Sequence, residues 1–278
     1  MWSGRVVALI GGEGRRMRVA MASVGKRAGR INEDFVGVLP EAAVLVDGAG
    51  IPGGEVTCRH GVAWYASHLG GTLLGLLPQD RDLADLLAEA ITHVTDDHRD
   101  TCAVTDPISP SAAVAVLRLS GDRADYLVLG DATIVIDRSE EGAPVVVTDR
   151  REVVISGRYE PALKAADPGS DEYRRILGEL RSHRNRPGGF WVAKDDPGAA
   201  REAVTGTVPG PASAALLSNG ASRIVDRFGL ADWPELMTEL ARKGPAEVIR
   251  RVREAEERQA VPPDDATIAH CTSLARPA

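Results

Sequence analysis

Acidic and amide side chains recur in this sequence at the ends of short apolar stretches, beside small residues. The five places are Glu33-Asp34 in NEDFVGV, Asp47 in VLVDGAG, Asp131 in LVLGDAT, Asn219 in LLSNGAS and Asp264 in PPDDATIAH. Taken alone, an aspartate or asparagine next to a glycine or another small residue is common in turns. A strand, however, holds a carboxylate at its end in a fixed position, and a following glycine lets a backbone carbonyl or a water come close to that carboxylate.

Oxygen ligands of this kind suit hard divalent cations such as Mg²⁺ or Mn²⁺, which usually keep several waters. Two such ions a few ångströms apart could activate a water and hold a phosphoryl group. The pattern therefore indicates metal-assisted hydrolysis, provided that the fold brings the five places together.

Composition limits the partners and the compartment. The chain has 278 residues, 44% of them hydrophobic, which is enough for one large domain or two small ones. A net charge of −7 argues against nucleic acid or an anionic membrane as partner. No apolar run resembles a signal peptide or a membrane span, so we expect a cytoplasmic protein. The three cysteines form no CxxC pair that would indicate structural zinc, and their odd number argues against a disulfide framework.

Hydrophobic periodicity predicts the elements that must position the acidic residues. Predicted strands cover 17–24, 34–39, 42–47, 111–119, 124–131, 133–138, 143–149, 203–208, 212–218 and 265–274. Helices are expected from Cys58 to about Leu77, where Gly70-Gly71 could break the pattern, and over 82–94 with Asp80 as N-cap. A further helix is expected over 171–183, and three more between the strand at 212–218 and about Gln259.

Strands and helices occur in separate runs, which indicates an α+β fold without alternating βαβ units. Residues 1–16 are predicted to be an N-terminal appendage, because GGEGRR reads as a flexible link. Residues 17–278 are then a single domain. It carries an insert at about 157–200, rich in charge and glycine, that we expect to form a mobile flap.

The five motifs, in this order, resemble the metal-dependent protein phosphatases of type 2C, the PPM family, including its bacterial members. The resemblance extends over most of the chain from Met17 to Leu274. It implies a four-layer αββα sandwich with a dinuclear Mg²⁺ or Mn²⁺ site at one edge. It also implies direct attack of metal-activated water on phosphoserine or phosphothreonine.

The resemblance implies roles for individual positions. Asp47 resembles the aspartate that bridges the two metals, and Gly48 the residue that lends its carbonyl. Glu33 and Asp34 match the early acidic pair, which binds metal directly or through water. Asp264 matches the late aspartate of the motif. Asp131 matches the aspartate that some members use for a third, weaker metal.

Two positions depart from the family pattern. Asn219 stands where the family has a metal-binding aspartate, and the loss of one unit charge beside two dications should weaken at least one site. Ala49 replaces a histidine that many eukaryotic members carry as a general acid. His60, near the start of the following helix, could supply that acid, since an imidazole titrates near neutrality. It could equally be an ordinary residue at a helix end.

The phosphate-binding basic residue is not singled out by the sequence. Gly29 occupies the position where the family has arginine, and Arg27 and Arg30 are the predicted phosphate ligands, with Lys26 close by. The main hypothesis is a serine/threonine phosphatase-like hydrolase acting on a phosphorylated protein. Two alternatives remain: a pseudophosphatase that binds a partner without turnover, and a phosphatase for a small phosphorylated metabolite.

Overall fold

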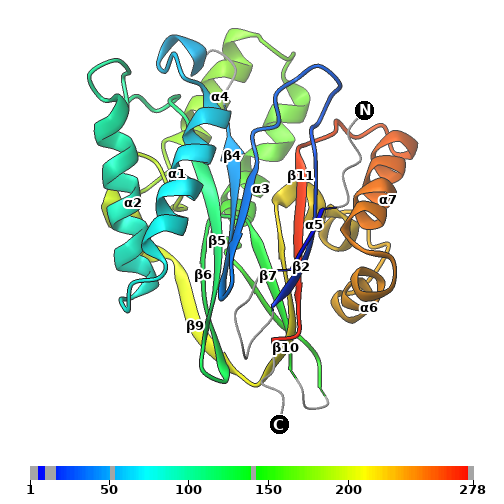
Figure 1. The fold of residues 1–278 in the computed structure, drawn as a ribbon. Helices are drawn as coiled ribbons and strands as arrows, with labels where there is room; N and C mark the ends of the chain where they lie inside the picture. Colours follow the sequence, from blue (N-terminus) through cyan, green and yellow to red (C-terminus); the bar gives the residue numbers. More distant parts are fainter. Residues whose placement is uncertain (1–5, 10–16, 51–53, 139–141, 275–278) are drawn as a thin grey trace.

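A computed structural model describes residues 6–9, 17–50, 54–138 and 142–274. Two antiparallel sheets lie face to face, and helices cover the outer face of each (Figure 1). The chain is therefore a four-layer αββα sandwich, and the predicted α+β class is confirmed.

The first sheet has six strands and carries the end of the chain in its middle. In spatial order they are β1 (Val6–Leu9), β2 (Arg18–Val24), β11 (Ala266–Thr272), β10 (Pro211–Leu217), β7 (Thr133–Arg138) and β8 (Val145–Thr148). The first and last thirds of the sequence thus pair directly, with Ala266 opposite Val24. This pairing brings the loop after β2 beside the loop before β11.

The second sheet has five strands. In spatial order they are β3 (Phe35–Leu39), β4 (Ala42–Ala49), β5 (Ser111–Ser120), β6 (Arg123–Leu129) and β9 (Val204–Pro209). The inner strand β4 is buried on both faces, which explains its continuous apolar run. Val44 and Val46 face the helices, whereas Ala43 and Leu45 face the other sheet. This period of two directs one face of the strand into each core.

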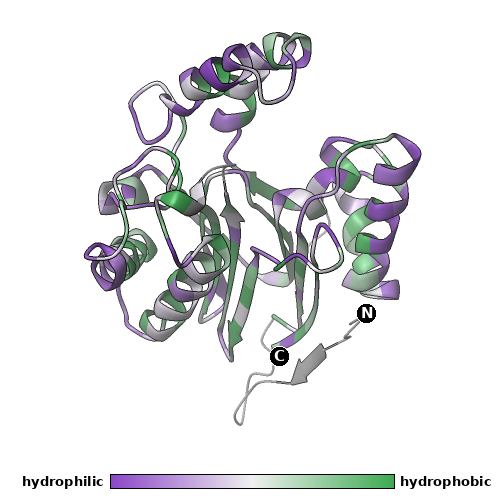
Figure 2. Cartoon of the chain, turned by 90° about the horizontal axis from the view of Figure 1, so that it is seen from above, coloured by the Kyte–Doolittle hydropathy of each residue, from purple (hydrophilic) through white to green (hydrophobic). Residues whose placement is uncertain are grey.

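Each sheet has its own helical layer. The helices α1 (Val62–Leu76) and α2 (Leu83–His98) cover the second sheet, and α5 (Asn219–Asp226), α6 (Trp233–Lys243) and α7 (Pro245–Arg258) cover the first. Seen from above, the hydrophobic sides of these helices turn towards the sheets (Figure 2). Gly70 does not break α1, because it serves close packing: a Cβ there would lie 2.1 Å from the Phe35 ring.

Three local features differ from the sequence expectations. The N-cap of α2 is Asp82, which accepts from the Ala84 amide, in place of Asp80. Part of the predicted appendage, Val6–Leu9, pairs with β2 as an edge strand, and the rest of residues 1–16 lies outside the described residues. A helix that periodicity did not indicate, α3 (Arg151–Ala165), precedes α4 (Asp171–Arg181). It contains Pro161 and buries only Ile155, so it has almost no apolar stripe to detect.

Candidate metal-binding active site

Five distant segments meet at one end of the sandwich, where the central strands of both sheets stop. Their side chains line a pocket of about 220 Å³. Among the residues expected from the sequence, Glu33, Asp47, Gly48, Asp131, Asn219 and Asp264 line it. The strand-end positions are thus neighbours, as a shared metal centre would require.

Asn219 connects two of the carboxylates. It is the first residue of α5, and its backbone N–H donates to Asp47 Oδ2 at 2.7 Å. Its side-chain Nδ2 donates to Asp131 Oδ2, also at 2.7 Å. A helix N-terminus carries partial positive charge, so Asp47 receives both a hydrogen bond and a favourable dipole. The amide oxygen of Asn219 remains available as an acceptor.

Gly48 lies where a side chain has no room. A Cβ at this position would lie 2.3 Å from the backbone oxygen of Glu33 and 2.8 Å from Val62. The glycine therefore lets the strand end at Asp47 approach the backbone of the Glu33-Asp34 segment. It places the two acidic motifs side by side.

Asp34 has a buried carboxylate without a partner. The residue as a whole is half-buried, but neither carboxylate oxygen reaches solvent or accepts a hydrogen bond. Burial raises the pKa of Asp34 to about 6, while the nearby Thr267 and Ser218 hydroxyls act in the opposite direction. A buried acceptor left unpaired is costly, and a cation is the partner such a group fits.

The carboxylates also repel one another. Burial, followed by the charges of Asp34 and Asp131, raises the pKa of Asp47 well above its usual range. Burial likewise raises the pKa of Asp131, although the Asn219 side chain partly offsets this. Both shifts arise first from burial and then from neighbouring carboxylates, and a divalent cation would offset both causes. The donor set therefore fits hard cations with oxygen ligands.

Asp265 fixes the loop that carries the early acidic pair. Its Oδ1 accepts from the Lys26 amide at 2.7 Å, and its Oδ2 accepts from the Glu33 amide at 3.1 Å. Lys26 Nζ then lies 2.5 Å from Glu33 Oε2 and 3.3 Å from Asp265 Oδ2. Sequence reasoning singled out Asp264 from this pair; its neighbour holds the loop, because β11 pairs with β2 directly beneath it.

Asp264 is oriented from the other side. Arg223 Nη2 donates to Asp264 Oδ2 at 2.8 Å, and Arg223 Nη1 donates to the buried Glu256 at 2.8 Å. Arg223 belongs to α5 and Glu256 to α7, so the outer helices hold this carboxylate in place. Neither residue has a sequence signal beyond its helical periodicity.

The predicted flap region reaches the pocket. Val192, within residues 157–200, forms part of the pocket wall, and so does Glu152, which lies in α3 just before that range. Burial, and then the charge of Asp131, raises the pKa of Glu152 to about 8, while Arg184 acts in the opposite direction. The sequence reasoning missed Glu152, since it lies in a helix without an evident stripe. A carboxyl group with a raised pKa keeps its proton to higher pH than an ordinary glutamate, and in that form it can donate a hydrogen bond into the pocket.

Four expected residues are not among those that line the pocket: Asp34, described above, and Arg27, Arg30 and His60. Arg27 and Arg30 are exposed on the loop between β2 and β3, whereas Lys26 of the same loop reaches the pocket wall. His60 stacks on Trp64 with ring centroids 4.4 Å apart, and its Nδ1 faces two cysteine thiols. Their predicted roles in phosphate binding and acid catalysis stay predictions.

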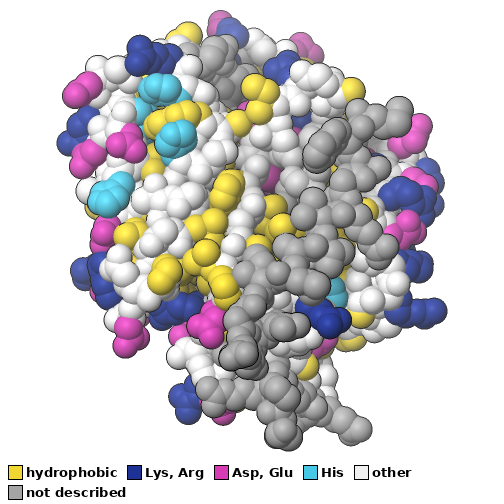
Figure 3. Space-filling view, in the orientation of Figure 1, with side chains coloured by type: hydrophobic (Ala, Val, Ile, Leu, Met, Phe, Trp, Pro, Cys, Tyr) yellow, Lys and Arg dark blue, Asp and Glu magenta, His cyan; other side chains and the backbone are white. Residues whose placement is uncertain are grey.

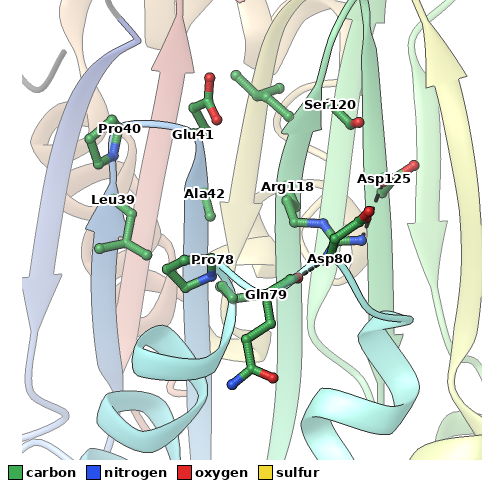
Figure 4. Close-up of a pocket in the computed structure, with 12 residues that line it drawn as sticks. Leu39, Pro40, Glu41, Ala42, Pro78, Gln79, Asp80, Arg118, Ser120 and Asp125 are labelled. Atoms are coloured by element: carbon green, nitrogen blue, oxygen red, sulfur yellow. Dashed lines mark hydrogen bonds and ion pairs between the residues drawn. The ribbon is translucent and has the colours of Figure 1, made fainter. Parts of the chain in front are cut away.

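A larger pocket, of about 640 Å³, lies at the opposite end of the strands (Figure 4). It is formed by the β3–β4 turn, the α1–α2 connection and the start of the β5–β6 hairpin. Its cation, Arg118, is already held by the Gln79 and Arg81 carbonyls and lies 3.6 Å from Asp125. The smaller acidic pocket is therefore the better candidate for chemistry, although it has about a third of the volume.

Comparison with solved structures identifies the fold. The serine/threonine phosphatase PstP/Ppp of Mycobacterium tuberculosis is similar with a TM-score of 0.55 and 19% identity over 92% of this chain and 98% of that one. The catalytic domain of PstP in complex with two manganese ions gives the same score and identity, over 92% and 97%. The serine/threonine phosphatase Stp1 of Staphylococcus aureus scores 0.56 at 11% identity, over 98% and 99%.

No protein-family model matches the sequence, and no curated protein sequence matches it. At 10–19% identity the structural likeness establishes the fold alone, which is that of the PPM-type phosphatases. Among the described residues, no helix is long and apolar enough to cross a membrane.

Proposed function

We propose that this chain is a metal-dependent phosphomonoester hydrolase that acts on phosphoserine or phosphothreonine in a protein substrate. The observation that supports it best is the meeting of Asp47, Asp131, Asn219 and Asp264 in one pocket, with the unpartnered carboxylate of Asp34 beside them. The phosphatase fold of similar structures supports the same reaction class.

The residues that would hold two Mg²⁺ or Mn²⁺ ions are Asp47, Gly48 through its carbonyl, Asp264, Asn219 and the Glu33-Asp34 pair, with Asp131 for a weaker third. Bound ions of this kind lower the pKa of water and offset the charge of a phosphoryl group. Asn219 has the position of a ligand but brings an amide oxygen without charge. Its bond to Asp131 keeps that oxygen oriented, so we expect weakened metal binding with turnover retained.

Lys26 is the basic group that we propose for the phosphate, in place of Arg27 and Arg30. It is the only lysine or arginine on the pocket wall within the described part of the chain. Its ammonium is held between Glu33 and Asp265, so it keeps a fixed place at the pocket edge. As a compact point charge it can attract a phosphate oxygen from that place without the bidentate geometry of arginine.

The first test is hydrolysis of p-nitrophenyl phosphate with Mn²⁺ titrated into metal-free protein. We expect turnover that requires the metal and is lost in Asp47→Asn. Asp122→Asn, which removes an exposed carboxylate at the β5–β6 turn, is the matched control and should keep full activity. Full activity in excess chelator would refute the mechanism. Metal binding without any turnover would favour the pseudophosphatase.

A second test separates the basic residues and the substrate classes. Lys26→Ala should raise the KM for a phosphopeptide about tenfold or more, whereas Arg27→Ala and Arg30→Ala should change it less than twofold. A loss of about 1.4 kcal/mol in phosphate binding corresponds to the tenfold change. The opposite ranking would return the role to Arg27 or Arg30. Turnover of sugar phosphates but of no phosphopeptide would instead identify a metabolite phosphatase.

A further inference from the structure

A second group of metal-ligating side chains lies outside the acidic pocket. Cys102 Sγ is 3.3 Å from Cys58 Sγ and 3.4 Å from His60 Nδ1, and His60 Nδ1 is 4.0 Å from Cys58 Sγ. None of these residues lines the acidic pocket. Within the described part of the chain, this is the one group of three or more histidine, cysteine, aspartate or glutamate side chains whose ligand atoms all lie within 4.8 Å of one another.

These separations match a shared metal ion better than a disulfide. In a tetrahedral zinc site, with Zn–S near 2.3 Å and Zn–N near 2.0–2.1 Å, ligand atoms lie about 3.8 Å apart for two sulfurs and about 3.6 Å for sulfur and nitrogen. The three observed distances scatter around these values. A disulfide would place the sulfurs about 2.05 Å apart.

We infer that Cys58, His60 and Cys102 form a binding site for one Zn²⁺ ion, with the fourth position open to water. Two thiolates and an imidazole are softer ligands than the carboxylates of the acidic pocket, so the two sites should select different metals. The site does not depend on the proposed phosphatase activity.

The surrounding structure holds the three ligands in place before any metal binds. Cys58 and His60 belong to the turn between the short 3-10 helix Gly54–Val56 and α1, and Cys102 follows α2. The backbone N–H of Ala103 donates to the Thr57 carbonyl at 2.8 Å, which joins the two loops directly beside the thiols. The ligands therefore need no large loop movement to converge.

Aromatic rings fix the orientation of His60. Its ring stacks on Trp64 at an interplanar angle of 25°, and the edge of His98 lies against the same indole, with centroids 5.1 Å apart. Histidine side chains gather with hydrophobic ones over this part of the surface, at the upper left of Figure 3. Cys58 is buried, whereas His60 and Cys102 are partly accessible, so an ion can enter from solvent.

A metal here would join two chain segments beside the acidic pocket. Cys58 and Cys102 are 44 positions apart, and α1 and α2 lie between them. Val62, at the start of α1, lies against Gly50 of the acidic pocket, where a Cβ on the glycine would lie 2.8 Å from the Val62 side chain. Zinc would therefore restrain the start of α1 against the end of α2 and stabilise the wall on this side.

The test uses the full chain, purified under reducing conditions without chelator. We expect about one zinc per chain by elemental analysis, and Co²⁺ added to the zinc-free protein should give a thiolate-to-cobalt charge-transfer band with tetrahedral visible bands. Cys58→Ser and Cys102→Ser should abolish both signals, and His60→Ala should weaken zinc binding at least tenfold. Cys271→Ala, which changes the buried cysteine of the core between the sheets, and His68→Gln, on exposed α1 surface, are the matched controls and should keep them.

A further variant distinguishes loss of the zinc site from loss of activity at the acidic pocket. Asp47→Asn, which alters only the acidic pocket, should keep the stoichiometric zinc and the cobalt spectrum even when hydrolysis is lost. If Asp47→Asn loses the bound zinc while Cys58→Ser and Cys102→Ser retain it, the inference is overturned. So would a zinc-free protein in which thiol titration finds one free cysteine and mass spectrometry finds Cys58 joined to Cys102.

Discussion

Changing Asn219 to aspartate tests the charge balance of the acidic pocket most directly. In the metal-free protein the change removes the Nδ2 bond to Asp131, and a hydrogen bond to a charged group contributes about 1.5–3 kcal/mol. It also places a third carboxylate beside Asp47 and Asp131. Two unit charges about 4 Å apart repel by about 4 kcal/mol at an effective dielectric constant of 20.

Proton uptake by the crowded carboxylates limits this repulsion, because a shared proton is cheaper than three full charges. We therefore expect Asn219→Asp to destabilise the metal-free protein by about 2–3 kcal/mol. For a domain of this size each kcal/mol lowers the Tm by about 2–4 °C. The melting temperature without metal should fall by about 5–10 °C.

With metal bound, the added charge contributes a stabilising attraction. The same arithmetic for a unit charge about 4 Å from a dication gives about 8 kcal/mol before desolvation. Even if desolvation removes most of that attraction, the remaining 1.4 kcal/mol would tighten Mn²⁺ binding tenfold. Asn219→Asp should therefore melt lower than the wild type without Mn²⁺, and saturating Mn²⁺ should reduce that deficit by about 1.4 kcal/mol. The variant should also turn over p-nitrophenyl phosphate faster.

The assay combines calorimetric titration of Mn²⁺ with melting curves of the metal-free and metal-loaded forms. Asn219→Ala is the matched control, because it loses the same hydrogen bond but adds no charge. It should melt lower in both states and bind Mn²⁺ no more tightly. If Asn219→Asp has the Mn²⁺ affinity of the wild type, position 219 is not a metal ligand, and the reasoning from charge is refuted.

Two further predictions concern stability and motion. Burial lowers the pKa of His270 on β11, so the folded state disfavours its protonated form. The contribution of His270 to the free energy of unfolding should be fully present above about pH 6.5 and should fall as the pH drops below it. For one proton, this fall is at most about 1.4 kcal/mol per pH unit. Comparing denaturant unfolding of wild type and His270→Asn at pH 7 and pH 5 checks this, since a pH dependence identical in both proteins would contradict it. Helices α3 and α4 each bury a single apolar residue, Ile155 and Ile176, so amides of residues 157–181 should exchange with solvent faster than those of β4 and β5. Exchange as slow as in those strands would show that the predicted flap is a rigid part of the domain.

The sequence by itself determined the order and type of most elements. Period-two and helical patterns are local, so β4, β5, α2 and the three C-terminal helices could be predicted from short windows. The motifs also indicated which residues could bind metal, because a carboxylate at a strand end beside glycine has a local signature. The helix α3 was missed for the same reason, since it lacks an apolar stripe and contains Pro161.

Tertiary structure decided which side chains meet. Lys26 and not Arg30 reaches the pocket, because Asp265 fixes the loop through strand pairing between β2 and β11, more than two hundred residues apart. Cys58 and Cys102 have no CxxC spacing, yet α1 and α2 run antiparallel and return the chain to its starting point, which places the two thiols together. Such contacts depend on the packing of whole elements, and no local pattern of residues carries that information.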